Sequence, residues 1–102
     1  MPFILIYTTN KDLEESQKIA NALLEKKLIA CANFFPIKSA YWWQGKINND
    51  DEYVSILKTK PDNWESVKKE IKQLHSYDCP CIIKMDVEAN SEYEDWVKKE
   101  VK

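Results

Sequence analysis

The stretch that decides the fold runs from Leu28 to Lys60 and reads LIACANFFPIKSAYWWQGKINNDDEYVSILKTK. Two long apolar and aromatic runs lie on either side of Gly45, the only glycine of the chain, and of the mostly polar residues 46–51 that follow it. Strand-forming runs separated by a short polar segment that contains glycine are typical of a β-hairpin. We therefore expect a hairpin of two long strands with its turn in residues 45–51.

The two halves of this hairpin differ in their apolar pattern. Residues 28–35 are almost continuously apolar, as in a strand covered on both faces, so we expect the first half to be central in the sheet. Residues 52–60 alternate, which indicates a strand with one buried face. Pro36 has no N–H group to donate, so we expect a bend or a bulge there before residues 40–43 resume an extended conformation.

Two adjacent tryptophans, Trp42 and Trp43, lie close to the expected turn. Neighbouring side chains in a strand point to opposite faces, and a chain of 102 residues has little core with which to cover both indoles. We therefore expect another subunit to cover at least one of them. The alternative is that a helix of the same chain covers both.

The segments on either side of the hairpin alternate between strand and helix patterns. Asp12 with Glu15, and Asp62 with Glu65, have the spacing of a capping box at a helix start. The expected elements, in chain order, are a strand at 3–7, a helix at 12–27, the hairpin, a helix at 61–74, a strand at 82–87 and a short helix from 91.

This order, β-α-β-β-α-β followed by a helix, predicts one α+β domain over residues 1–102. The expected architecture is a ferredoxin-like sandwich, in which helices cover one face of an antiparallel sheet with a long central hairpin. The other face has no helices to cover it. Because the strands carry aromatic and aliphatic residues, we expect that face to be hidden in a homo-oligomer.

The composition excludes several classes of protein. With 15 basic and 17 acidic residues the net charge is −2, so we expect no nucleic acid partner and no membrane partner. All basic residues are lysines, which argues against an enzyme that depends on arginine. One glycine excludes a glycine-rich nucleotide site. An apolar run at the start that is too short for a signal peptide leads us to expect a cytoplasmic protein with its cysteines as thiols.

The most specific chemical feature is Cys79-Pro80-Cys81, which follows His75. Soft thiolates favour copper(I) or zinc over hard ions, so His75, Cys79 and Cys81 are the candidate metal ligands. The alternative is that the cysteines are small hydrophobic residues at the start of a buried strand, with His75 as a helix cap or a hydrogen-bonded partner. Cys31, inside an apolar run, is expected in the core.

No residue is assigned a catalytic role. A nucleophilic cysteine needs a base that a third group orients, and the chain has one histidine with nothing in the sequence to orient it. The acidic residues 50–52 and 92–95 are expected to be solvated or to cap a helix. We therefore expect a protein that is not an enzyme and has no obligatory cofactor.

Several separate motifs closely resemble the CutA family, the divalent-cation tolerance proteins. They are Tyr7–Thr9, Leu28–Asn33, Tyr41–Ile47, Ile56–Thr59, Leu74–Pro80 and Tyr93–Trp96, and they span nearly the whole chain. The resemblance implies a cytoplasmic ferredoxin-like homotrimer in which strands of neighbouring subunits pair, similar in assembly to the PII signalling trimers. It also implies tolerance of copper and other divalent metals, a signalling or scaffolding role and no established reaction.

The metal ligands attributed to bacterial members of this family match Tyr7, Leu74 and Cys81 of this sequence, and only Cys81 can coordinate a metal. Cys79 and His75 lie close enough in sequence to complete a softer site. The resemblance further implies a cleft or interface between subunits, for which we expect Trp42, Trp43, Lys58, His75 and Tyr77.

These inferences lead to two expectations of function. The first is a homotrimer that binds copper or another soft metal ion, or relays metal status to an unknown protein partner. The alternative is a trimeric signalling scaffold whose cleft between subunits binds a small molecule or a partner protein.

Overall fold

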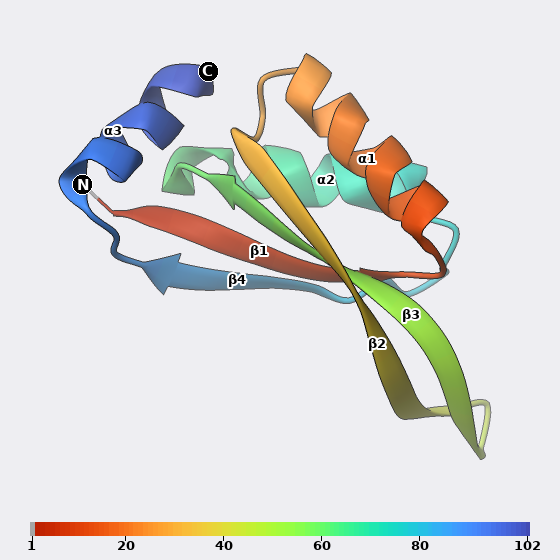
Figure 1. Cartoon of the computed structure of the whole chain (residues 1–102). Helices are drawn as coiled ribbons and strands as arrows, with labels where there is room; N and C mark the ends of the chain where they lie inside the picture. Colours follow the sequence, from red (N-terminus) through yellow and green to blue (C-terminus); the bar gives the residue numbers. More distant parts are fainter. Residues whose placement is uncertain (1) are drawn as a thin grey trace.

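The computed structural model describes residues 2–102 and contains four strands and three α-helices (Figure 1). The elements, in order, are β1 (Phe3–Asn10), α1 (Leu13–Glu25), β2 (Cys31–Trp43), β3 (Lys46–Thr59), a 3-10 turn (Pro61–Asn63), α2 (Trp64–Leu74), β4 (Ile82–Val87) and α3 (Ser91–Glu100). The expected β-α-β-β-α-β order with a final helix is confirmed.

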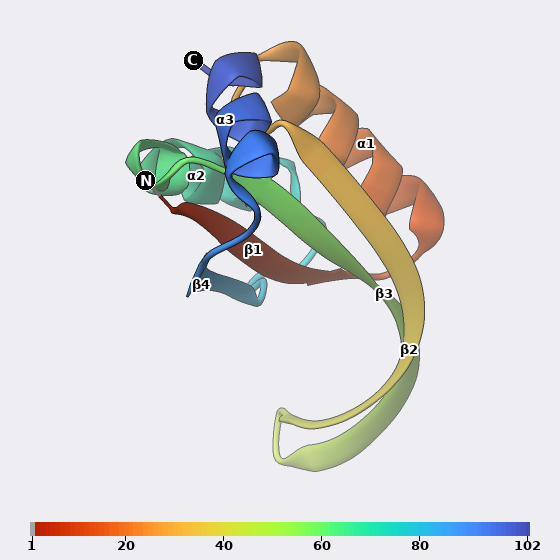
Figure 2. The ribbon, with the colours of Figure 1, turned by 60° about the vertical axis from the view of Figure 1, so that its left-hand side comes forward.

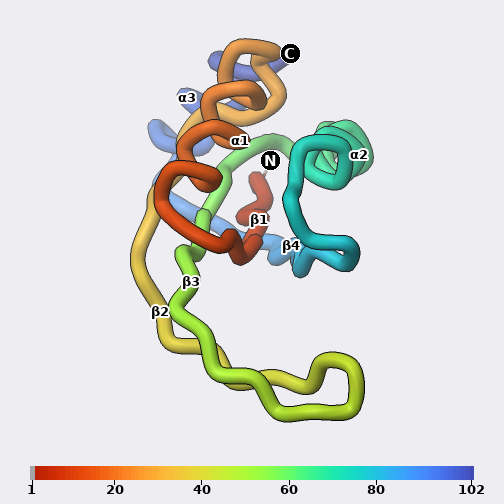
Figure 3. Tube along the Cα trace, turned by 90° about the vertical axis from the view of Figure 1, so that its right-hand side faces the viewer, coloured from red at the N-terminus to blue at the C-terminus, as the bar shows by residue number. Residues whose placement is uncertain are grey.

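All strand pairs of the sheet are antiparallel, and the strand order is β2-β3-β1-β4. The helices α1 and α2 lie side by side on one face (Figures 1 and 3). Side chains of β1, β3 and both helices fill the space between them; the buried cluster is Ile4, Ile6, Ile19, Ala20, Leu23, Leu28, Ile29, Leu57, Val67 and Ile71. The core therefore lies on the helical face of the sheet.

The opposite face, called here the open face, is not covered by α1 or α2. Because side chains alternate along a strand, the neighbours of buried Ile4 and Ile6 point to it. In register across the three strands, the open face carries Leu5, Tyr7, Ile56, Lys58, Ile83 and Met85. Two parts of this face are covered within residues 2–102. At the end near the N-terminus the Tyr93 ring of α3 lies 5.9 Å from the ring of Phe3, and at the other end Val54 and Glu52 of β3 are buried.

The helix α1 has a defined cap at each end. Asp12 accepts a hydrogen bond from the backbone N–H of Glu15 at 2.8 Å, so the predicted capping at Asp12 is confirmed. At the other end Lys27 has a φ of 57°, and Leu28 donates its N–H to the carbonyl of Leu23 at 3.0 Å. This is a Schellman ending, which turns the chain sharply from α1 towards β2.

The predicted capping of the second helix by Asp62 is wrong. The chain enters α2 through the 3-10 turn, and the residue at the cap position, Asn63, makes no capping bond. Its buried amide instead donates to the carbonyl of Leu28 at 3.2 Å and to the hydroxyl of Thr59 at 3.1 Å. A buried carbonyl such as that of Leu28 needs hydrogen-bond donors. The Asn63 side chain therefore stabilises the junction between α1 and the hairpin and does not cap its own helix.

The hairpin turn is shorter than expected. It consists of Gln44 and Gly45, with φ values of 51° and 78°, which is the two-residue turn that matches the twist of paired strands. Residues 46–51, expected in the turn, belong to β3 and pair with β2 up to the turn itself. Residues 46–51 are mostly polar because this part of β3 extends beyond the body of the chain.

The expectation that the first half of the hairpin is central is also wrong, because β2 is an edge strand. Leu28 and Ile29 precede the strand and fill the core, whereas Phe35 within it is 42% exposed. The apolar run therefore consists of a core segment followed by a strand with an uncovered face. In sequence, this combination looks like one strand covered on both faces. Cys31, at the start of β2, is half-buried on the open face rather than in the core.

Pro36 causes no bulge. The pairing of β2 with β3 keeps one register from Cys31 to Trp43 (Pro36 opposite Tyr53), and the strand curves continuously instead (Figure 2). An edge strand tolerates the missing N–H of proline because one of its sides has no neighbour.

Beyond Asn10, where β1 ends, the hairpin continues as a two-stranded ribbon, residues 37–52, called here the arm. It curves away from the body of the molecule (Figures 2 and 3). At its end Trp42 is 71% exposed and Trp43 is 46% exposed. The alternative that a helix of the same chain covers both indoles is therefore wrong.

Replacing Lys27 by glycine is expected to raise the free energy of unfolding by up to about 1 kcal/mol, because glycine adopts a positive φ without steric cost. The matched control is Glu25→Gly, in the last turn of α1, where glycine is expected to lower it by a similar amount. Urea unfolding at equal chain concentrations measures both. Equal destabilisation by the two substitutions would contradict the Schellman ending.

Candidate functional site

The connection between α2 and β4, residues 75–81, brings together most of the side chains singled out in the sequence. It carries His75, Tyr77, Cys79 and Cys81, and is called here the thiol loop. In the tube view it runs from the end of α2 to the start of β4, next to the end of β1 (Figure 3). Three polar contacts hold it to the rest of the fold.

The first contact fixes the imidazole of His75. Nε2 lies 2.7 Å from the carbonyl oxygen of Thr9, and Nδ1 accepts the backbone N–H of Tyr77 at 3.1 Å. Because a carbonyl can only accept, Nε2 carries the proton and Nδ1 is the acceptor, which is one tautomer of the neutral ring. Both ring nitrogens are therefore engaged, and no lone pair is free for a metal or a proton transfer.

The second contact fixes the backbone after His75. The carboxylate of Glu15 on α1 accepts the N–H of Ser76 at 3.0 Å and the N–H of Lys11 at 3.1 Å. Burial alone raises the pKa of Glu15, but its hydrogen bonds with Ser76 and Lys11 outweigh burial and lower the pKa from its ordinary value. This contribution to stability is present at neutral pH and is lost as the pH falls through the lowered pKa.

The third contact joins the thiol loop to the base of the arm. The hydroxyl of Tyr77 donates to Oε2 of Glu52 at 2.6 Å, and Glu52 is only 7% exposed. Burial, followed by the hydrogen bond and charge of Glu52, raises the pKa of Tyr77 well above its usual value. Tyr77 therefore stays a neutral donor throughout the physiological pH range.

Glu52 was missed as a site residue, because the acidic group 50–52 was expected to be solvated. That expectation is wrong for Glu52, whose carboxylate lies under the thiol loop. The unbroken register of the hairpin places Glu52 opposite Ile37 in a strand, rather than in a turn. The signal that could have found it is the glycine, since a two-residue turn at Gly45 puts Glu52 seven residues into a strand.

The two cysteines of the thiol loop differ in environment. Cys79 is exposed, whereas Cys81 is half-buried. Burial, then the negative charge of Glu52 and the neighbouring Cys79, raise the pKa of the Cys81 thiol. Cys81 is consequently protonated at neutral pH in the absence of a metal.

The predicted ligand set His75, Cys79 and Cys81 lies on one loop, but the three side chains do not form a closed metal site. His75 does not fit as a ligand while both of its nitrogens are hydrogen-bonded. Within residues 2–102, no group of three or more His, Cys, Asp and Glu side chains is arranged to hold a metal ion. The thiols of Cys79 and Cys81 remain, and two sulfurs fit the donor preference of a soft monovalent cation.

The other residues expected at an interface lie apart from one another in the single chain. Trp43 lies at the end of the arm, on the continuation of the open face, and Trp42 lies on the opposite side next to Ile47. Lys58 lies near the middle of the open face, with Nζ 5.4 Å from the centre of the Tyr93 ring. These groups can form one site only if a second chain brings them together.

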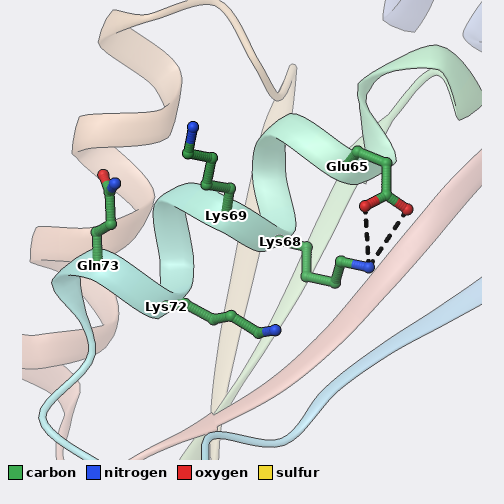
Figure 4. A pocket seen from close by; sticks show the side chains of 5 residues that line it. All are labelled: Glu65, Lys68, Lys69, Lys72 and Gln73. Carbon is green, nitrogen blue, oxygen red and sulfur yellow. Dashed lines mark hydrogen bonds and ion pairs between the residues drawn. The ribbon is translucent and has the colours of Figure 1, made fainter.

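Two hollows on the surface lie away from the thiol loop. One of about 390 Å³ lies along the outer side of α2, where Lys68 pairs with Glu65 beside Lys69, Lys72 and Gln73 (Figure 4). Another of about 580 Å³ lies on the arm, around residues 38–40 and 49–51. Both are open surface lined by solvated side chains, and neither contains a cysteine, a histidine or a buried carboxylate.

Comparison with known proteins identifies the family. The profile described as CutA1 divalent ion tolerance protein matches residues 4–100. This chain belongs to the CutA1 family. It is 47% identical over 100 residues to the divalent-cation tolerance protein CutA of Pyrococcus horikoshii, covering 97% of this chain and 98% of that protein. The CutA of Archaeoglobus fulgidus is 46% identical over 97 residues, covering 94% and 95% of the two chains.

Solved CutA structures have the same fold. A solved structure of the A. fulgidus CutA, described as periplasmic, superimposes with a TM-score of 0.95 at 44% identity, covering 98% of this chain and 99% of that one. CutA1 of Oryza sativa gives a TM-score of 0.95 at 33% identity, covering 100% and 95%. The resemblance to the CutA family and the ferredoxin-like α+β fold are thereby confirmed.

No helix among residues 2–102 combines the length and the apolar character needed to cross a membrane.

Replacing Tyr77 by phenylalanine is expected to lower the free energy of unfolding by about 1–3 kcal/mol, because the buried carboxylate of Glu52 loses its donor. The control is Tyr41→Phe, since Tyr41 bonds Asp50 on the exposed part of the arm and the loss of that bond is expected to lower the free energy of unfolding less. Chemical unfolding at one chain concentration measures both. A Tyr77→Phe variant as stable as Tyr41→Phe would contradict the contact between the thiol loop and the arm.

Proposed function

We propose that this protein acts in divalent-cation tolerance as a homotrimer that binds a soft cation, with copper(I) as the best candidate, through Cys79 and Cys81. The observation that carries the proposal is the pair of free thiols on a loop that three contacts hold to the fold. Membership of the CutA1 family supports the role in metal tolerance.

The thiol pair suits copper(I) for chemical reasons. Thiolates are soft ligands, and copper(I) accepts two of them without a third donor. Binding must displace the proton of Cys81, whose raised pKa makes that step costly at low pH. The affinity for copper(I) should therefore rise with pH across the neutral range.

The trimer is proposed from the surfaces that a single chain leaves uncovered. The arm pairs only with itself, and the open face carries exposed apolar side chains, among them Phe35, Tyr41, Trp43, Ile83 and Met85. The unpaired edge of β2 offers backbone groups to a strand of another chain. The number of chains, three, is the one that the resemblance to the CutA family implies.

We also propose that the protein binds and signals rather than catalyses. The one histidine of the chain has both ring nitrogens in hydrogen bonds, so it is not available as a general base. A cytoplasmic location belongs to the same proposal, because a reducing compartment keeps Cys79 and Cys81 as the thiols that the proposed site needs.

A second candidate function is a trimeric scaffold whose cleft between subunits binds an anionic small molecule or a partner protein. The observation that favours it is Lys58, a half-buried lysine on an apolar face. Its ammonium group lies over the Tyr93 ring. If another chain covers this face, the charge of Lys58 is buried. A buried charge needs a partner, so a negatively charged group is favoured next to Lys58.

Native mass spectrometry of the reduced protein, with and without one equivalent of copper(I) per chain under anaerobic conditions, tests the proposal. The expected result is a trimer that takes up as many as three copper ions. The double replacement of Cys79 and Cys81 by serine should abolish uptake and leave the trimer intact, whereas Cys31→Ser should change neither. A trimer that ignores copper would contradict the metal role and favour the scaffold.

A further inference from the structure

The chemistry of the thiol loop extends beyond metal binding, because its two cysteines are separated by a single proline. Proline has a fixed φ, and residue 80 lies outside helix and strand. Chain connectivity keeps the Cα atoms of Cys79 and Cys81, two residues apart, within about 7 Å of each other. Disulfides join Cα atoms about 4.4–6.8 Å apart, so the spacing of the two cysteines is compatible with the bond.

The loop is held at points other than the cysteines. His75 is fixed to β1, Ser76 to α1 and Tyr77 to the arm. These contacts all precede Cys79, and β4 begins directly after Cys81. The two thiols therefore lie on a short segment that is held on both sides, which keeps them near each other and away from Cys31 at the far end of β3.

The two thiols also have different access to solvent. Cys79 is exposed and can meet a dissolved oxidant, whereas Cys81 is half-buried beside Glu52. An exposed thiol with a second thiol next to it is the arrangement of a redox-sensing pair, in which the first is oxidised and the second resolves it.

We propose that Cys79 and Cys81 form a reversible disulfide within one chain when a peroxide oxidises the loop, and that this disulfide prevents the soft cation from binding. In the first step the Cys79 thiolate attacks a peroxide oxygen, the O–O bond breaks, and a sulfenic acid and hydroxide form. In the second step the sulfur of Cys81 attacks the sulfenic sulfur and displaces hydroxide. In total two thiols lose two electrons and two protons, and hydrogen peroxide becomes two molecules of water.

The disulfide would regulate the site proposed above, and in that respect this inference rests on the proposed function. A disulfide has no thiolate to offer, so the oxidised loop loses the donors that suit copper(I). A cellular dithiol reverses the step by thiol–disulfide exchange. The loop would then hold a soft cation under reducing conditions and release it under oxidation.

Counting thiols tests the disulfide without reference to metal. The reduced full-length protein, with copper and iron chelators present, is treated with hydrogen peroxide, then unfolded, alkylated and weighed by intact mass spectrometry. The wild type should fall from three alkylated cysteines to one, with Cys31 still alkylated and no crosslinked chains on a non-reducing gel. Dithiothreitol should restore all three.

Matched variants assign the bond. Cys31→Ser should fall from two alkylated cysteines to none, whereas Cys79→Ser and Cys81→Ser should form no disulfide within the chain. Retention of three thiols at a peroxide dose that oxidises an exposed cysteine in an unfolded control would overturn the proposal. A bond that involves Cys31, or one between chains, would overturn it as well.

A copper(I) competition assay separates this inference from the proposed function. Reduced protein should bind copper(I), and peroxide-treated protein should lose at least about 90% of that binding until dithiothreitol is added. If the disulfide forms but the reduced protein binds no copper(I), the proposed metal role fails and the redox pair stands. If the oxidised protein still binds copper(I) at Cys79 and Cys81, the regulatory step is wrong.

Discussion

A two-stranded ribbon is at best marginally stable in water, and this constraint governs the rest of the molecule. The arm extends beyond the last residue of β1, and within residues 2–102 no third strand pairs with it. Its base is tied to the body by the hydrogen bond from Tyr77 to Glu52, but its end exposes Trp42, Trp43 and Ile47. In the proposed trimer, a second copy of the chain would cover these side chains.

The same contact links assembly to the thiol loop. Tyr77 donates to the base of the arm, and the loop that carries it also carries Cys79 and Cys81. Glu52 serves both sides, because it accepts from Tyr77 and its charge raises the pKa of the Cys81 thiol. One hydrogen bond, from Tyr77 to Glu52, therefore connects the loop that carries the cysteines with the base of the arm.

Most of the fold could be predicted from the sequence, because apolar periodicity and capping residues act locally. The order of elements, the bounds of β4 and the cap at Asp12 followed from such local rules. The position of β2 at the edge of the sheet could not be predicted in this way. A core segment followed by an edge strand with an uncovered face gives the same apolar run as a central strand covered on both faces. At the candidate site, the sequence shows which segment carries the cysteines. It could not predict the hydrogen bonds of His75 and Glu52, because these join residues far apart in sequence.

Hydrogen–deuterium exchange of the native protein tests the central claim most directly, because it reports on the backbone of the arm itself. Amides of residues 41–48, at the end of the arm, should be protected nearly as well as those of β1, since strands of another copy would pair with or cover them. Exchange should become fast when the protein is diluted until it dissociates. Fast exchange of the arm in the undiluted protein, as for a free ribbon, would contradict the account.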